Sequence, residues 1–110
     1  MEALESKVCQ PCRGDVSKAT EEEIKLYQQQ VPDWQIIEVE QILKLQRLFQ
    51  FKNFKEALAF TNRVGAIAEE AKHHPDLLTQ WGKVTVTWYT HKLGGLHEND
   101  FIMAAKTDRI

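Results

Sequence analysis

The sequence predicts an α+β fold in which three helices cover one face of a four-stranded antiparallel sheet, in the order α-β-β-α-β-β-α. Three observations predict it: a long amphipathic pattern in the middle, a pair of short alternating segments on each side of it, and helix-starting signals near both ends. Strands that follow one another in pairs form hairpins, so the sheet is antiparallel. Its uncovered face must then meet solvent, a ligand or a second subunit.

The N-terminal part divides into a leader and a first helix. Residues 1–16 have no sustained hydrophobic period and contain proline and glycine, so we expect an extended leader before a single domain over residues 17–110. Thr20 and Glu23 form a capping box that begins a short amphipathic helix. Pro32 ends this helix, because proline cannot continue it.

Two hairpins are expected, one on each side of the central helix. Apolar and polar residues alternate over 34–39 and 43–51, which predicts the first pair of strands. The second pair covers 77–81 and 84–91, and the Gly-Lys pair at 82–83 suits a type II′ turn because its first residue is glycine.

The central helix is expected from a cap at Asn53 to about residue 72, and Pro75 prevents its continuation. A last helix is expected from about His97, after a Gly-Gly pair. The apolar side of the central helix contains Ala57, Phe60, Val64, Ile67, Ala68 and Ala71.

Composition argues against several classes of function. The chain is 43% hydrophobic and 27% charged with a net charge of −2, which gives no general attraction for nucleic acid or anionic membranes. No apolar run approaches the roughly 20 residues of a membrane span, and the N-terminus lacks the regions of a signal peptide. We therefore expect a cytoplasmic protein with neither nucleic-acid nor membrane partners.

Cys9 and Cys12 are the only cysteines and are spaced as Cys-x-x-Cys. In a reducing compartment we expect free thiols rather than a structural disulfide, with a labile redox pair as an alternative. A zinc site would need a second pair of ligands, and no histidine has the spacing to Cys12 that a zinc finger requires. We expect neither a metal nor a cofactor.

The residues that most clearly suggest chemistry are three histidines. His73 and His74 stand at the broken end of the central helix, and His91 stands at the expected end of a strand. Glu69 lies four residues before His73, so its carboxylate can reach that imidazole and fix its tautomer. Because imidazoles exchange protons near neutral pH, this pattern favours a compact acid–base site over a metal site.

Structural roles remain open for the same residues. A histidine at a helix C-terminus, such as His73, commonly compensates the helix dipole, and an acidic residue such as Asp100 does so near a helix start. The tryptophans Trp34, Trp81 and Trp88 would normally lie in a core or an interface.

The spacing of seven residues resembles the signature of the pterin-4a-carbinolamine dehydratases: Glu69, His73, His74, Pro75, Trp81, His91 and Asp100. The resemblance extends from about Thr20 to the C-terminus. It implies dehydration of a 4a-hydroxytetrahydropterin to the quinonoid dihydropterin, which recycles tetrahydrobiopterin, without a metal or an organic cofactor. It also implies a homodimer or a homotetramer.

The resemblance assigns roles to individual residues. His74 and His91 would be the acid and base residues, and His73 would bind substrate and transfer protons secondarily. The residues implied to bind substrate or support the site are Glu69, which would orient His73, together with Pro75, Trp34, Thr90 and Asp100. The alternatives are a dehydratase or binding protein for another pterin of the molybdopterin type, and a noncatalytic interaction module.

Overall fold

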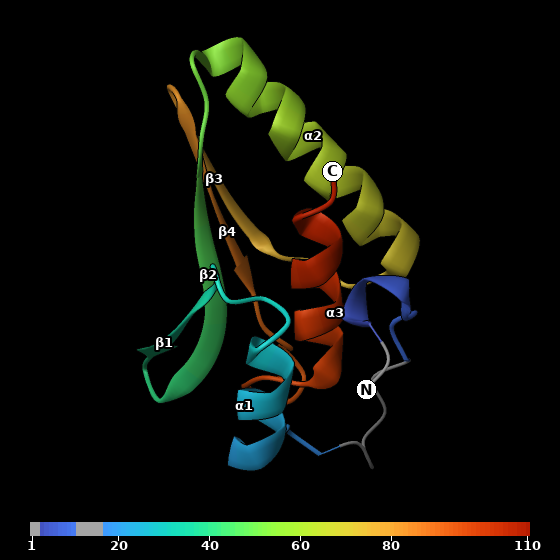
Figure 1. The fold of residues 1–110 in the computed structure, drawn as a ribbon. Coiled ribbons are helices and arrows are strands. Elements are labelled where there is room, and N and C mark those ends of the chain that lie inside the picture. Colours follow the sequence, from blue (N-terminus) through green and yellow to red (C-terminus); the bar gives the residue numbers. More distant parts are fainter. Residues whose placement is uncertain (1–2, 11–16) are drawn as a thin grey trace.

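The computed structural model describes residues 3–10 and 17–110 (Figure 1). In chain order the elements are η1 (Leu4–Ser6), α1 (Glu21–Gln28), β1 (Gln35–Val39), β2 (Ile42–Gln50), α2 (Phe54–Ala71), β3 (Asp76–Gln80), β4 (Lys83–Trp88) and α3 (Glu98–Thr107). The predicted fold class and order of elements are confirmed, and η1 is an additional short 3₁₀ helix in the leader.

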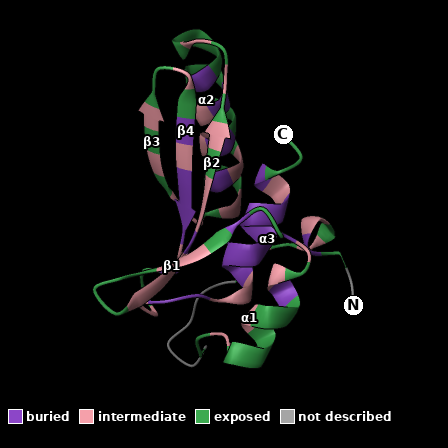
Figure 2. Ribbon diagram, turned by 60° about the vertical axis from the view of Figure 1, so that its left-hand side comes forward, coloured by how far each residue is buried: buried purple, intermediate pink, exposed green. Residues whose placement is uncertain are grey.

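The sheet joins the two hairpins in the strand order β1-β2-β4-β3, with every neighbouring pair antiparallel. Figure 1 shows α2 and α3 on the same side of the sheet. Val84, Val86 and Trp88 on β4 have no exposed surface. Leu78 on β3 pairs with Thr85, which points to the opposite face of the sheet, and it is 56% exposed. Figure 2 shows β4 as a largely buried central strand. One face of the sheet is therefore covered and the other is open, as predicted.

The helix-starting signals form as expected. The Thr20 hydroxyl accepts a hydrogen bond from the Glu23 backbone N–H at 3.1 Å, and the Glu23 carboxylate accepts the Thr20 N–H at 2.9 Å. The hydrogen bond from the Thr20 N–H lowers the pKa of Glu23. At α2, the Asn53 side chain accepts the N–H of Glu56 at 2.9 Å. Both caps satisfy backbone donors that the first helical turn leaves without helical partners.

The turn of the second hairpin differs from the prediction. Gln80 pairs with Lys83, so the two loop residues are Trp81 and Gly82 rather than Gly82 and Lys83. Glycine therefore occupies the second loop position, with φ of +73°, whereas a type II′ turn needs positive φ at the first. This shift also leaves Trp81 at the hairpin tip with 71% of its surface exposed, so it is not a core residue.

Strand β4 is also shorter than predicted, because it ends at Trp88 rather than at His91. Thr90 makes only an isolated bridge to Gly95, and its N–H bonds to the Gly95 carbonyl oxygen at 2.8 Å. The chain thus turns back on itself directly after β4. His91 lies on this turn, exposed to solvent.

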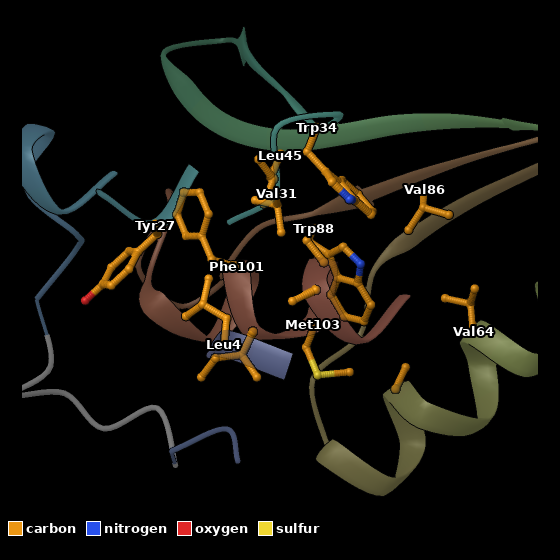
Figure 3. Close-up of a cluster of buried hydrophobic side chains, with 14 of the residues drawn as sticks. Leu4, Tyr27, Val31, Trp34, Leu45, Val64, Val86, Trp88, Phe101 and Met103 are labelled. Carbon is orange, nitrogen blue, oxygen red and sulfur yellow. The ribbon is translucent and has the colours of Figure 1, made fainter. Parts of the chain in front are cut away.

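The core lies between the sheet and the helices and includes part of the leader. Figure 3 shows Trp34, Trp88, Phe101 and Met103 together with Leu4, all with at most 1% of their surface exposed. The described part of the leader is therefore packed into the fold instead of extending away from it. Within the described residues, no helix is both long enough and apolar enough to cross a lipid bilayer.

Cys9 is a half-buried free thiol, whereas Cys12 lies outside the described residues. Burial, assisted by the negative charge of Asp100, raises the pKa of the Cys9 thiol to about 11. The thiolate is the nucleophilic form, so Cys9 is weakly reactive at neutral pH. This environment disfavours Cys9 as an attacking thiol in a redox pair.

In a Cys12→Ser variant, we expect iodoacetamide to alkylate Cys9 at pH 8 at least tenfold more slowly in the folded protein than in urea, because the folded thiol is both protonated and half-buried. Mass spectrometry of timed samples measures both rates. Equal rates in the two states would contradict the assigned environment.

Candidate functional site

The end of α2 sends the two adjacent histidines in different directions. Lys72 caps the helix in the left-handed conformation, with φ of 56°, and the His73 N–H bonds to the Ala68 carbonyl oxygen at 3.1 Å. This hydrogen-bond pattern is typical of an α-helix that ends with a residue in the left-handed conformation. Strand β3 then begins at Asp76, directly after Pro75.

His73 is held by a buried carboxylate. Its Nε2 lies 2.6 Å from Oδ1 of Asp100, and the two side chains are 13% and 0% exposed. The imidazole also stacks on the ring of Trp88, with centroids 5.6 Å apart and planes inclined by 14°. If the carboxylate only accepts hydrogen bonds, this contact uses an Nε2–H of His73 and leaves Nδ1 as the nitrogen for proton exchange.

The second oxygen of Asp100 is also occupied. Oδ2 accepts the Thr90 hydroxyl at 2.8 Å and the His97 backbone N–H at 2.9 Å. The His97 ring in turn accepts the Asn99 N–H at 3.1 Å, so His97 caps α3 as a helix-start residue. Asp100 therefore joins three segments of the chain: the end of α2, the turn after β4 and the start of α3.

His74 pairs with Glu69, through Nε2 and Oε2. Both side chains are largely exposed, at 59% and 78% respectively. The expected pairing of Glu69 with His73 is therefore wrong. It assumed that helical geometry continues for four residues beyond Glu69, but Lys72 leaves that geometry and turns His73 towards Asp100.

His91 lies beside the ring of Tyr89, the residue that directly follows β4. Its ring centroid is 4.2 Å from that of Tyr89, and the Lys44 ammonium lies 4.2 Å from the centroid of the same Tyr89 ring. His91 directly follows Thr90, whose hydroxyl binds Asp100. No sequence motif indicates the contact between Lys44 and Tyr89. It depends on the register in which β2 pairs with β4.

Strand register places all three histidines at one end of the sheet. Asp76 at the start of β3 pairs with Thr87 near the end of antiparallel β4. Residues 73–75, just before β3, therefore lie at the same end of the sheet as residues 88–90. Pro75 thus lies at this end. Trp34 is fully buried instead: its ring packs on Phe49 and its indole N–H donates to Asp108 at 2.9 Å. Its described contacts stabilise the core.

The histidine cluster is a surface site in the single chain. A cavity of about 500 Å³ lies between the leader, α2 and the end of α3. Neither this cavity nor two smaller ones among the described residues is lined by His73, His74 or His91. Nor do three or more His, Cys, Asp or Glu side chains of the described residues gather as a metal-binding group. One half-buried and two exposed imidazoles at a sheet end define a candidate acid–base site.

Comparison with known proteins agrees with this fold and pattern. The family described as pterin 4 alpha carbinolamine dehydratase matches residues 17–110. The chain belongs to this family.

Two relatives share the full length of the chain. Proteins of Nitrosococcus oceani and Syntrophotalea carbinolica, each named "Putative pterin-4-alpha-carbinolamine dehydratase", are 56% and 54% identical over 110 residues. The matches cover 100% of this chain and 97% and 98% of the relatives. These matches include the leader, which lies outside the family match.

Solved structures of similar fold include the transcriptional coactivator/pterin dehydratase from Brucella melitensis, with a TM-score of 0.75 and 31% identity over 84% of this chain and 97% of that one. A second is a pterin dehydratase-like protein described as a RuBisCO assembly factor in the alpha-carboxysome. It has a TM-score of 0.59 and 23% identity over 70% of this chain and 87% of that one, which shows the shared fold alone.

Proposed function

We propose that this chain converts a 4a-hydroxytetrahydropterin into the quinonoid dihydropterin and water, as a step in tetrahydrobiopterin recycling. Membership of the family supports the pterin substrate and the dehydration. The structural observation that carries the proposal is the Asp100-bound imidazole of His73 at the sheet end that also bears His74 and His91. Such a cluster supplies proton donors and acceptors for one substrate.

The reaction needs one proton donor and one acceptor. A protonated imidazole gives its proton to the hydroxyl at C4a, and the C–O bond breaks as the lone pair of a ring nitrogen forms a double bond to that carbon. A second, neutral imidazole removes the proton from the ring nitrogen, so the hydroxyl leaves as water and charge is conserved. Each transfer typically contributes about 10²–10⁴-fold.

We assign the two transfers to His74 and His91, whose exposed rings can reach a ligand from solvent. His73 binds the substrate and transfers protons secondarily through Nδ1. Glu69 orients His74, Asp100 and Thr90 hold His73 in place, and Pro75 shapes the site. Trp34 supports this arrangement from the core.

The direct test measures the loss of chemically generated 4a-hydroxytetrahydropterin by rapid-mixing absorbance spectroscopy. We expect the purified protein to accelerate dehydration at least about 10²-fold over buffer at pH 7.5. The control is the same protein after thermal denaturation. A rate equal to that of buffer would exclude the proposed reaction.

We further propose a homodimer or homotetramer in which the open sheet face is a contact surface. Leu48 and Leu78 are 49% and 56% exposed there, and both pair with Thr85 of β4, so they flank it in one row. We expect sedimentation equilibrium to give a dimer or tetramer, and Leu48→Lys with Leu78→Lys to dissociate it at least tenfold more readily, because charge on a buried apolar contact is costly. A monomeric wild type, or an unchanged assembly, would contradict this interface.

A further inference from the structure

The described leader residues form hydrogen bonds with the first turn of α3, which contains Asp100. The Asn99 side chain, which is 2% exposed, accepts the Gln10 N–H at 2.9 Å and donates to the Gln10 carbonyl oxygen at 2.7 Å. One side chain therefore binds both backbone groups of one leader residue. Next to it, Lys7 bonds to Glu98 at 2.6 Å.

The far end of the leader is anchored independently. Leu4 is fully buried in the core, and its N–H donates to the Gln30 side chain at 2.8 Å. Lys106 donates to the Glu5 carbonyl oxygen at 3.1 Å, and the Arg109 guanidinium pairs with the Glu5 carboxylate. Because these contacts fix η1 against α3, the stretch from residue 7 to residue 10 is held across the start of that helix.

Three consecutive residues of α3 connect this stretch to the candidate site. Glu98 and Asn99 bind the leader, and the next residue, Asp100, binds His73 and Thr90. A buried amide that loses its hydrogen-bond partners is destabilising unless the structure shifts to satisfy it. Movement of this helical turn would displace the carboxylate that sets the orientation of His73.

We propose that residues 4–10 of the leader form a strap that positions the paired side chains of His73 and Asp100, and that Asn99 is the positioning residue through which the strap acts. The leader lies outside residues 17–110, the part of the chain that the family match covers. The strap rests on the proposed function only for its effect on rate. Its effect on the His73 ring exists whether or not the chain is a dehydratase.

The test compares wild type with Asn99→Ala, using ¹⁵N-labelled histidine to report the tautomer of His73. In the wild type we expect the Nε2–H tautomer, because Nε2 faces the carboxylate of Asp100. In Asn99→Ala we expect the two ring-nitrogen signals to move towards each other, as the tautomers mix. We also expect kcat to fall about tenfold with KM changed less than about twofold, because positioning errors mainly affect the reacting geometry.

The matched control is Arg109→Met, which removes one exposed leader contact far from Asp100 but keeps the Leu4 and Lys106 anchors, so it should leave both the tautomer and kcat unchanged. Asn99→Ser provides the same test if Asn99→Ala does not fold. Unchanged His73 signals in a folded Asn99 variant would overturn the strap. A wild type without dehydratase activity whose His73 signals still respond to Asn99 would instead overturn the proposed function and support the strap.

Discussion

Replacement of both His74 and His91 by alanine is expected to reduce dehydration to near the rate in buffer, and at least one single replacement to cost tenfold or more. These two imidazoles are assigned the donor and the acceptor of the reaction, and each transfer is worth about 10²–10⁴-fold. A single variant retains activity where water or His73 substitutes for the missing group. The measurement is kcat/KM for wild type, both single variants and the double variant.

Lys92→Ala is the control for that series, because Lys92 is an exposed neighbour of His91 with no assigned role. It should retain the wild-type rate within about twofold, because it changes an exposed side chain with no assigned role, leaves both imidazoles in place and should alter stability little. A folded double variant with the wild-type rate would remove both assigned roles.

Asp100→Ala is expected to lower the free energy of unfolding by about 3 kcal/mol, the largest stability effect expected at the site. It leaves three donors without their acceptor: His73 Nε2, the Thr90 hydroxyl and the His97 N–H. Each orphaned buried donor costs about 1–3 kcal/mol, reduced where water enters or the structure relaxes. Urea denaturation monitored by tryptophan fluorescence measures the loss.

Asp108→Ala is the matched control. Asp108 also accepts two donors, from Trp34 and Arg47, but it is 24% exposed, so water replaces part of what is lost. We expect a loss of about 1 kcal/mol. Equal losses for the two variants would show that the buried Asp100 network is not a special source of stability.

Asp100→Asn separates charge from shape. Both carboxylate oxygens accept hydrogen bonds, but an amide has only one oxygen and must aim its NH₂ group either at His73 or at the Thr90 hydroxyl. If the NH₂ group faces His73, a change of the His73 tautomer lets the ring accept its hydrogen bond. The variant should therefore be more stable than Asp100→Ala and still have a lower kcat than the wild type.

The helices and strands could be predicted because their periodicity reflects burial directly. The apolar pattern of α2 predicted that Ala57, Phe60, Val64 and Ala68 face the core, and all four are buried. The alternation of apolar and polar residues along β4 likewise predicted which of its side chains are covered. The turns were harder. Glu40 and Gln41 both adopt positive φ, of 51° and 68°, between β1 and β2, although neither residue is glycine or asparagine.

The partners of the site residues could be predicted only in part. Histidine spacing indicated the three rings, but the partner of His73 depends on the left-handed cap at Lys72, a position where glycine is the usual signal. The role of Asn99 could not be predicted, because a buried amide is informative only once its partner in the leader is known. Long-range contacts of this kind leave no local pattern.

The most direct test of the central claim is a titration of ¹⁵N-histidine-labelled protein with a stable pterin analogue of the substrate. If the rings of His73, His74 and His91 bind one ligand, their signals shift together along a single saturable curve. The signals of His97, whose Nδ1 accepts the Asn99 N–H, serve as an internal control and shift least. Saturable binding that leaves the His91 signals unchanged would contradict a site shared by the three imidazoles.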